Sequence, residues 1–337
     1  MLHLSVKNII QTLTESGTNR DSIEDRRNKG WGKVADISGI LSQLPDIRKV
    51  EIGLKLRDTK LINGMIYSTE AWSRISDIEV TRLEQVDLAL LRSLVEAHSK
   101  CSKAFILLEF GVISFSHLIR IRRIMYHHHI IRRDDKEIIK KIYLKQKEDN
   151  LKGDWFQTLL TNFASIKEDL DDERISKIPK EEYRKYIKPK VEKEAFESYM
   201  KLKEKCKKKM KYLEYDKLAI QSYIINGSFT LKQTKLLFSL RSHCYPAKIN
   251  FRKMNRGNLG CSLGCNEDES QSHIFEKCKP LRLKLKLEKP TVLANIYGSV
   301  HEQRDIVTQF EQIDDQWKIM TSHILPGGSV ARTPVKL

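Results

Sequence analysis

The stretch CSLGCNEDESQSHIFEKC, residues 261–278, decides how the C-terminal part of this chain folds. It contains a set of metal-ligand side chains in the pattern C-x3-C-x7-H-x4-C: Cys261, Cys265, His273 and Cys278. Thiolate sulfur and imidazole nitrogen are good ligands of Zn2+, and four of them close a tetrahedral site. Gly264 lets the backbone turn so that the first two sulfurs converge, and the last two ligands fit nearly one face of a short helix. The pattern predicts a structural zinc module, because a closed site leaves no position for a substrate.

A disulfide, or a set of thiols that never meet, would also account for these cysteines. The first residues, MLHLSVKNIIQ, lack the charged start and the long apolar core of a signal peptide, so we expect an intracellular protein, nuclear or cytoplasmic. Intracellular thiols stay reduced, which disfavours a disulfide. Thiols that never meet remain an open alternative. The other cysteines are scattered, and we interpret them as ordinary: Cys101, Cys206 and Cys244.

Composition and charge limit the kinds of partner. The chain has 337 residues, of which 40% are hydrophobic, enough for a real core. A net charge of +17 and a pI near 9.5 indicate a polyanionic partner, which is nucleic acid or an anionic membrane surface. No apolar run reaches the ~18 residues that cross a bilayer. We expect no membrane-embedded segment, and no small-molecule substrate is evident.

The chain is predicted to be mainly α. Proline (8) and glycine (15) are few, and no strand-like alternation recurs. Ser76 and Glu79 in SDIE form a capping box, which predicts a helix that continues to Leu94. Apolar residues at helical spacing predict further helical stretches: 50–72, 110–148 and 306–317. The expected architecture is a helical bundle, a basic helical linker and the small CCHC zinc module.

Basic and aromatic residues alternate just before the cysteine cluster, after a capping box of Thr230 and Gln233. Cations neutralise phosphates and aromatic rings stack on bases, so this pattern suits nucleic acid. The candidate nucleic-acid-binding residues are Arg241, Lys248, Phe251, Arg252, Lys253 and Arg256. A solvated loop with two core aromatics accounts for the pattern equally well.

A second basic stretch covers 180–217, with 14 Lys and Arg against 8 Asp and Glu. It is either a helical linker that follows a nucleic-acid backbone or a solvated charged face.

Two motifs resemble catalytic or metal sites, but we do not expect either of them to act as one. His127, His128 and His129 are consecutive, and consecutive helix positions lie ~100° apart, so no two share a face and we expect them on a helix surface. Asp134 and Asp135 are paired like metal-binding aspartates, but they stand between basic residues at a helix junction. We expect a solvated turn or a helix N-terminus there.

Four stretches, followed by the cysteine cluster, carry a family resemblance: EIGLKLRDTKLINGMIYSTEAWSRIS (51–76), RLEQVDLALLRSLVEAHSK (82–100), RRIMYHHHIIRRDDKEIIKKIYLKQKE (122–148) and GDWFQTLL (153–160). In this order they resemble the C-terminal part of a LINE-type (non-LTR) retrotransposon reverse transcriptase. The resemblance extends over most of the chain, from 19 to 278.

The resemblance implies a helical thumb, a linker and a zinc knuckle that grip template RNA and DNA. The family's zinc ligands carry over onto Cys261, Cys265, His273 and Cys278. The implied organisation is a remnant of the palm-to-thumb connection (1–30), a helical thumb-like domain (31–150), a basic helical linker (151–225), the CCHC zinc-knuckle region (226–325) and a disordered tail (326–337).

The chain departs from this family where catalysis is concerned. The palm signature Y/F-x-D-D is missing, and with it the carboxylates that hold two Mg2+ ions. We therefore expect a non-catalytic, nucleic-acid-binding fragment with no catalytic residue. Two alternatives stay open: an active reverse transcriptase whose palm and Mg2+ come from outside this chain, and a zinc-stabilised protein-interaction module.

Overall fold

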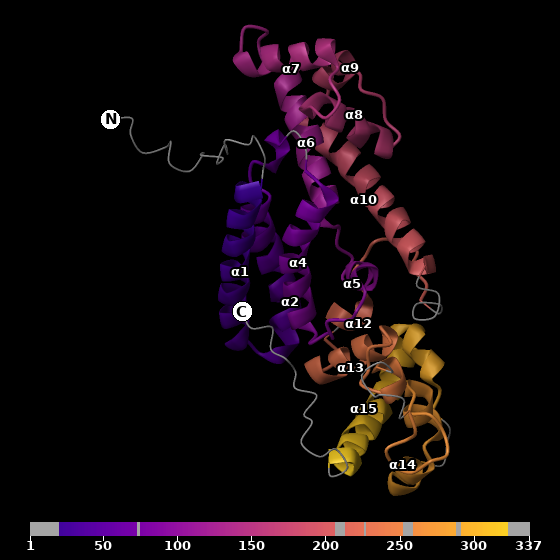
Figure 1. The fold of residues 1–337 in the computed structure, drawn as a ribbon. Helices are drawn as coiled ribbons and strands as arrows, with labels where there is room; N and C mark the ends of the chain where they lie inside the picture. The colour runs from indigo at the N-terminus through magenta and orange to yellow at the C-terminus, as the bar shows by residue number, and fades with distance from the viewer. Residues whose placement is uncertain are drawn as a thin grey trace. The chain divides into compact units, whose positions relative to one another are not determined.

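The computed structural model describes residues 20–72, 75–205, 213–225, 227–251, 259–287 and 291–322. Over these residues the chain is helical, with two isolated β-bridges and no strand (Figure 1). The predicted mainly α fold is confirmed. None of the described helices combines the length and apolar character that crossing a bilayer requires.

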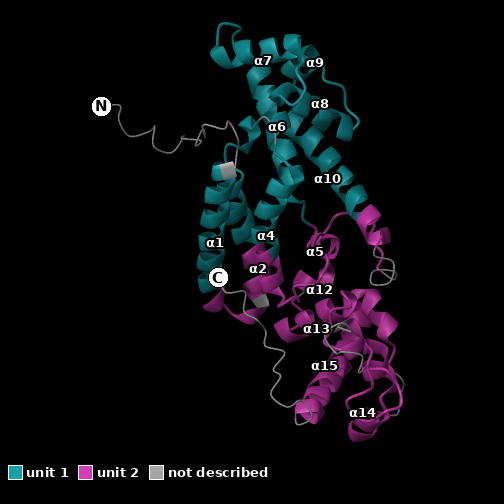
Figure 2. Cartoon of the chain, in the orientation of Figure 1, with its two compact units in different colours: residues 1–40, 55–88, 112–199 teal, residues 41–54, 89–111, 200–337 magenta. Residues whose placement is uncertain are grey.

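The chain divides into two compact units, each assembled from separate stretches of sequence (Figure 2). Unit 1 holds the described residues of 1–40, 55–88 and 112–199, and unit 2 those of 41–54, 89–111 and 200–337. Helices wholly or mostly in unit 1 are α1 (Arg20–Ser42), α3 (Asn63–Met65), α4 (Asp77–Leu94), α6 (Phe115–Ile131), α7 (Ile138–Asp149), α8 (Trp155–Ser165), α9 (Asp172–Lys177) and α10 (Lys180–Lys205), with a π-helical turn η1 (Arg57–Ile62) and a 3-10 turn η2 (Thr69–Ala71).

Unit 2 contains shorter helices and one long one. They are α2 (Asp46–Leu56), α5 (Lys103–Glu109), α12 (Ser222–Ile225), α13 (Leu231–Arg241), α14 (Lys279–Lys284) and α15 (Val300–Ser322), with the 3-10 turns η3 (Lys248–Phe251) and η5 (Leu293–Tyr297) and the π-helical turn η4 (His273–Lys277).

Both predicted capping boxes are present. The Ser76 hydroxyl accepts a bond from the backbone of Glu79 (3.3 Å), and the Glu79 carboxylate accepts one from the backbone of Ser76 (2.8 Å). Thr230 and Gln233 make the same reciprocal pair at the start of α13. Each box satisfies backbone donors that the first helical turn leaves without a carbonyl partner.

Two predicted helical stretches are interrupted. The stretch 50–72 contains the end of α2, then η1, α3 and η2, and Trp72 at its end is completely buried in unit 1. The stretch 110–148 forms α6 and α7, separated by a turn in which Asp134 Oδ1 accepts a bond from the Lys136 backbone (2.8 Å). Asp134 and Asp135 are exposed, as the predicted solvated turn requires.

The expectation that His127 and His128 lie on a helix surface is wrong. His127 is 0% exposed, with Nε2 2.9 Å from an Asp172 carboxylate oxygen. His128 is 2% exposed, binds the Ile178 carbonyl (2.9 Å) and stacks on Tyr183. Neighbouring positions can both be buried here because α6 packs against several other helices of unit 1.

A buried carboxylate organises unit 2. Glu109, at the end of α5, is 0% exposed and accepts bonds from the Tyr215 hydroxyl (2.6 Å), the Tyr223 hydroxyl and the Arg241 guanidinium (2.8 Å). Arg241 also donates to the Ile296 carbonyl (2.7 Å). One ion pair therefore joins α5, α12, α13 and η5, and burying it is tolerable because both charged groups have several hydrogen-bond partners.

Glu109→Gln should destabilise unit 2 by about 3–5 kcal/mol, because the buried Arg241 charge would lose its counter-ion. Equilibrium urea unfolding followed by circular dichroism measures the change. The matched control is Asp315→Asn, which removes the partner of Lys232 in an ion pair whose side chains are 51% and 46% exposed. The control substitution should lower the free energy of unfolding by less than about 1 kcal/mol. Equal losses in the two variants would contradict this role of Glu109.

Candidate metal centre

The four side chains that the sequence singles out as ligands converge in unit 2. One ligand atom from each of Cys261, Cys265, His273 and Cys278 lies within 4.8 Å of all the others. The Cys278 sulfur is 4.0 Å from the Cys261 sulfur and 3.9 Å from the Cys265 sulfur. These separations far exceed the ~2.05 Å of a disulfide bond. They agree with the ~3.8 Å edge of a tetrahedron built on Zn–S distances of ~2.3 Å.

A tight turn places the first two ligands. The Gly264 backbone donates to the Cys261 carbonyl (3.1 Å), and Gly264 has φ +79°, a conformation that a side chain would strain. The Leu263 backbone N–H points at the Cys261 sulfur (3.4 Å). Such a donor stabilises negative charge on a sulfur, which suits a metal-bound thiolate.

A π-helical turn places the other two ligands. The Cys278 backbone donates to the carbonyl of His273, five residues earlier, at 2.7 Å. The predicted short helix is therefore present as a wider turn. Its i→i+5 hydrogen bond spans the same five residues that separate the two ligands, so it brings their side chains together.

The two nitrogens of His273 have different surroundings. Nδ1 lies 3.1 Å from a carboxylate oxygen of Glu267. Nε2 is buried and has no hydrogen-bond partner among the described residues. A buried nitrogen in this condition fits a metal ligand, and a carboxylate on the opposite nitrogen is the usual way to orient such an imidazole. The residues present therefore fit a metal ion, with Nε2 as the coordinating atom.

Without a cation Cys265 and Cys278 favour the neutral thiol. Burial raises the pKa of Cys278, and the neighbouring sulfurs of Cys261 and Cys265 raise it further. Burial, together with a hydrogen bond with Cys261, also raises the pKa of Cys265. A divalent cation would reverse this preference by pairing with the thiolates, so metal binding should release protons and weaken in acid.

Buried polar groups tie the cluster to the rest of unit 2. Glu269 is 1% exposed, and its carboxylate accepts a bond from the Ser262 backbone (2.9 Å), inside the first ligand turn. Gln271 is 4% exposed and donates to the Leu240 carbonyl at the end of α13 (3.0 Å). The sequence analysis missed Glu267 and Glu269, although both stand between the ligands in NEDES.

The cluster also rests on an aromatic core. Phe275, in η4, is completely buried and packs edge-on against Tyr245 (ring centres 5.0 Å apart) and Phe310 of α15 (5.2 Å). The Tyr245 hydroxyl donates to Asp314 of α15 (2.7 Å). The ligand turns thus pack against the core of unit 2.

No protein-family model, curated protein or solved structure matches this chain. The resemblance to retrotransposon reverse transcriptases therefore rests on the quoted stretches alone. What the chain does has to be inferred from its own geometry.

The predicted nucleic-acid-binding residues lie in different surroundings. Arg241 is 3% exposed and its guanidinium is held by Glu109, so it is a core residue and cannot reach a phosphate at the surface. The sequence could not show this, because the counter-ion is 132 residues away. Lys248 is half-buried and donates to the Gly260 carbonyl (2.7 Å). The remaining candidates lie outside the residues whose side chains are described: Phe251, Arg252, Lys253 and Arg256.

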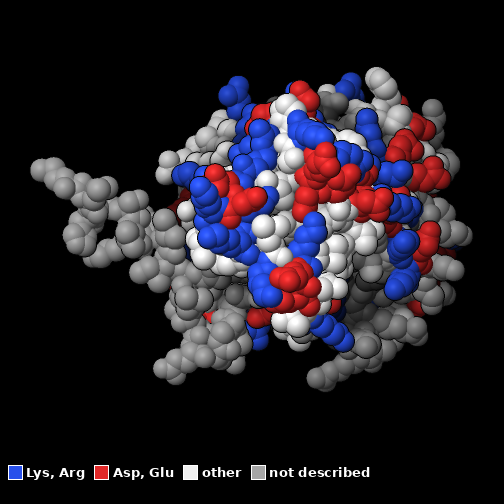
Figure 3. Space-filling view, turned by 90° about the horizontal axis from the view of Figure 1, so that it is seen from above, with Lys and Arg blue, Asp and Glu red and all other residues white. Residues whose placement is uncertain are grey.

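Charged side chains are interspersed on the face that Figure 3 shows. Lysine and arginine alternate there with clusters of acidic residues, and they do not merge into one basic patch on that face. Phosphate contacts on this face would therefore come from individual exposed cations.

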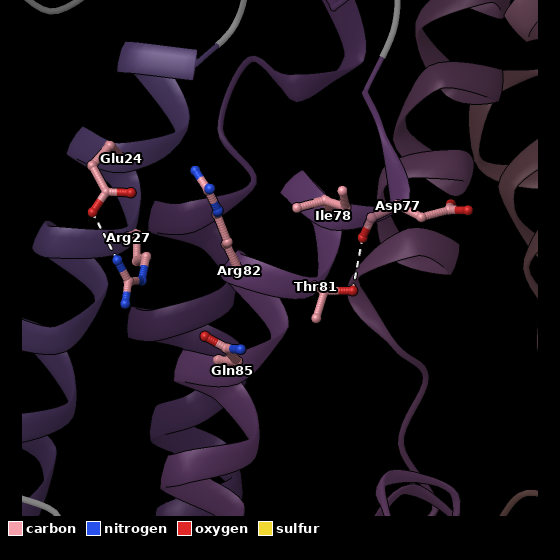
Figure 4. Close-up of a pocket in the computed structure, with 7 residues that line it drawn as sticks. All are labelled: Glu24, Arg27, Asp77, Ile78, Thr81, Arg82 and Gln85. Atoms are coloured by element: carbon pink, nitrogen blue, oxygen red, sulfur yellow. Dashed lines mark hydrogen bonds and ion pairs between the residues drawn. The ribbon is translucent and has the colours of Figure 1, made fainter.

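A shallow hollow of about 560 Å³ opens between α1 and α4 of unit 1 (Figure 4). Its lining is Glu24, Arg27, Asp77, Ile78, Thr81, Arg82 and Gln85. Arg27 is paired with Glu24 (2.7 Å), and the Thr81 hydroxyl donates to the Asp77 carbonyl (2.7 Å). Nothing in the hollow points to a particular ligand, so we assign it no function.

The purified protein should bind one Co2+ per chain, with the visible absorption bands of tetrahedral sulfur coordination, because the four ligand atoms are already close together. Cys265→Ser should lose these bands. The matched control is Cys101→Ser, which changes a buried cysteine outside the cluster and should leave the spectrum intact. Equal spectra for wild type and Cys265→Ser would exclude the cluster as the binding site.

Proposed function

We propose that this protein binds RNA and DNA through exposed cations on a zinc-stabilised helical fold, and that it catalyses no reaction by itself. This is the role of the C-terminal thumb, linker and zinc-knuckle region of a LINE-type reverse transcriptase, which the sequence resembles. Polymerase activity would require Mg2+-binding carboxylates from a palm outside this chain.

The proposed metal is zinc in a structural role. Three sulfurs and one imidazole nitrogen form a donor set that suits Zn2+ and disfavours the oxygen-preferring Mg2+ and Ca2+. Four protein ligands fill a tetrahedron, so no position remains for a substrate. The buried, partnerless Nε2 of His273 and the Glu267 carboxylate on Nδ1 support this assignment.

The observation that carries the nucleic-acid proposal is the division of α10 into a buried apolar stripe and a charged surface, with nine Lys and Arg against six Glu over 180–205. Every fourth residue from 183 to 199 is buried: Tyr183, Ile187, Val191, Ala195 and Tyr199. Lys180, Arg184 and Lys185 are exposed on the same helix. The buried stripe fixes the helix, so these cations are held at the surface of a chain with a net charge of +17. Fixed cations of this kind contact phosphates without reading sequence.

Replacing Lys180, Arg184 and Lys185 with Ala should make duplex DNA binding less dependent on salt. The slope of the logarithm of the binding constant against the logarithm of the salt concentration should become less steep by about 0.9 for each lost phosphate contact. Fluorescence anisotropy across a salt series measures the slope. The matched control is the triple Ala variant of Lys29, Lys145 and Lys177, three exposed lysines of unit 1 that are paired with acids. Both variants lose three charges. Identical slopes in the two would show that only net charge matters and would remove the α10 surface from the interface.

The purified protein should contain one zinc ion per chain by inductively coupled plasma analysis. Its removal by a strong chelator should unfold the region around the cluster, because structural zinc stabilises isolated fingers by about 10–16 kcal/mol. Circular dichroism and limited proteolysis follow the unfolding. Protein free of zinc yet folded, or protein with a different metal, would contradict the assignment.

A protein-interaction module is the second candidate, and one observation favours it. Helix α7 leaves Ile138 and Ile142, which are one helical turn apart on the same face, 72% and 51% exposed. Binding through such a surface would depend little on salt, whereas phosphate contacts depend on it strongly. The salt series therefore separates the two candidates.

A further inference from the structure

In the segment that follows the last candidate ligand, every charged residue is basic. Residues 279–287, KPLRLKLKL, contain four Lys and Arg and no Asp or Glu. On α10, by contrast, nine Lys and Arg are mixed with six Glu. The segment contains α14 and belongs wholly to unit 2 (Figure 2). It therefore concentrates positive charge without the acidic neighbours that dilute it on α10.

Three cations of this segment are exposed: Lys279, Lys284 and Lys286. Among the residues that the structure describes, none of the three ammonium groups has a hydrogen-bond or ion-pair partner. Glu276, the nearest acidic residue before the segment, is engaged elsewhere, because its carboxylate accepts bonds from the Ser272 hydroxyl and the Leu293 backbone (2.7 Å). The three ammonium groups are therefore accessible to an anion in solvent.

Contacts within unit 2 fix the backbone that carries these lysines. Leu281 is 1% exposed, and α14 packs against α15. The fourth cation, Arg282, has a structural role. Its guanidinium donates to the carbonyls of Glu276 (3.3 Å) and Leu287 (3.0 Å), so it joins the two ends of the segment.

The candidate metal cluster holds the start of α14. The backbone N–H of Lys279 donates to the Cys265 sulfur, and that of Leu281 donates to the Cys278 sulfur. The Arg282 backbone donates to the Cys278 carbonyl (3.0 Å). The lysines thus extend from an anchored backbone, which has less conformational entropy to lose on binding than a flexible tail.

The side chains of the segment distinguish between kinds of polyanion. Base stacking needs an exposed aromatic ring, and the segment contains no aromatic residue. A membrane surface binds helices with a whole apolar face, whereas among these leucines only Leu283 is largely exposed (79%). Phosphates spaced along a nucleic acid need only ammonium groups at the surface, and such contacts read no bases. This chemistry favours a sugar–phosphate backbone over an anionic membrane.

We propose that Lys279, Lys284 and Lys286 form a phosphate-binding surface on unit 2, which contacts the sugar–phosphate backbone of a nucleic acid without reading its bases. The assignment rests on the proposed nucleic-acid-binding function, and it adds to the cations of α10 a second contact region in the other unit.

Fluorescence anisotropy across a salt series tests this surface on the full chain, with two duplex DNAs of unrelated sequence. Replacing Lys279, Lys284 and Lys286 with Ala should make the slope of the logarithm of the binding constant against the logarithm of the salt concentration less steep. The change should be about 0.9 for each lysine that contacts a phosphate, and it should be the same on both duplexes.

The matched control is the triple Ala variant of Lys29, Lys145 and Lys177, which removes the same charge from lysines that are paired with acids. The Co2+ spectrum of the α14 variant shows whether the metal cluster is intact. If that spectrum is lost, Lys284→Glu alone takes the place of the triple variant, because one reversed charge on an exposed side chain leaves the backbone contacts of α14 in place.

The outcomes separate this surface from the proposed function. A slope less steep in the α14 variant than in the control supports the surface. Equal slopes in the two variants, with salt-dependent binding by the wild type, overturn the surface and leave the proposed function standing. Wild-type protein that shows no salt-dependent binding contradicts both. A change that differs between the two duplexes, or unchanged DNA binding with lost binding to phosphatidylserine vesicles, also overturns a sequence-independent phosphate contact at α14.

Discussion

The ion pair between Glu109 and Arg241 is the constraint on which unit 2 depends. Neither charge is accessible to water, so each must find its partners inside the protein. Their bonds fix the end of α13, and the Leu240 carbonyl at that end receives the Gln271 amide. Gln271 stands two residues before His273. The position of a metal-ligand segment is therefore coupled to a carboxylate more than 150 residues earlier in the chain.

Two features support the cluster of four candidate ligands. The ligand turns supply the local geometry, through the positive φ of Gly264 and the π-helical turn that ends at Cys278. Phe275 joins these turns to the aromatic core on α15. In a small isolated knuckle the ion alone holds the fold, whereas these ligand turns also pack against the core of unit 2. Rigid support of this kind keeps ligands in place for a particular metal.

The sequence correctly predicts the features that depend on residues close together in the chain. The ligand spacing, the capping boxes at Ser76 and Thr230, and the mainly α pattern depend on residues a few positions apart, and the structure contains all of them. The sequence was misleading where burial depends on distant partners. Arg241 looks like a phosphate contact until Glu109 is placed beside it, and His127 looks exposed until Asp172 covers it. Such pairs have no signature in a single sequence.

The π-helical turn η4 fixes the number of residues between the last two ligands. The carbonyl of His273 reaches the backbone of Cys278 only across an i→i+5 interval. Deleting one intervening residue would give an α-helical turn and rotate the cysteine by about 100° around the axis, away from its companions. Natural variation in this segment should therefore exclude changes of length, keep Ile274 and Phe275 apolar, and tolerate exchanges at the exposed Lys277.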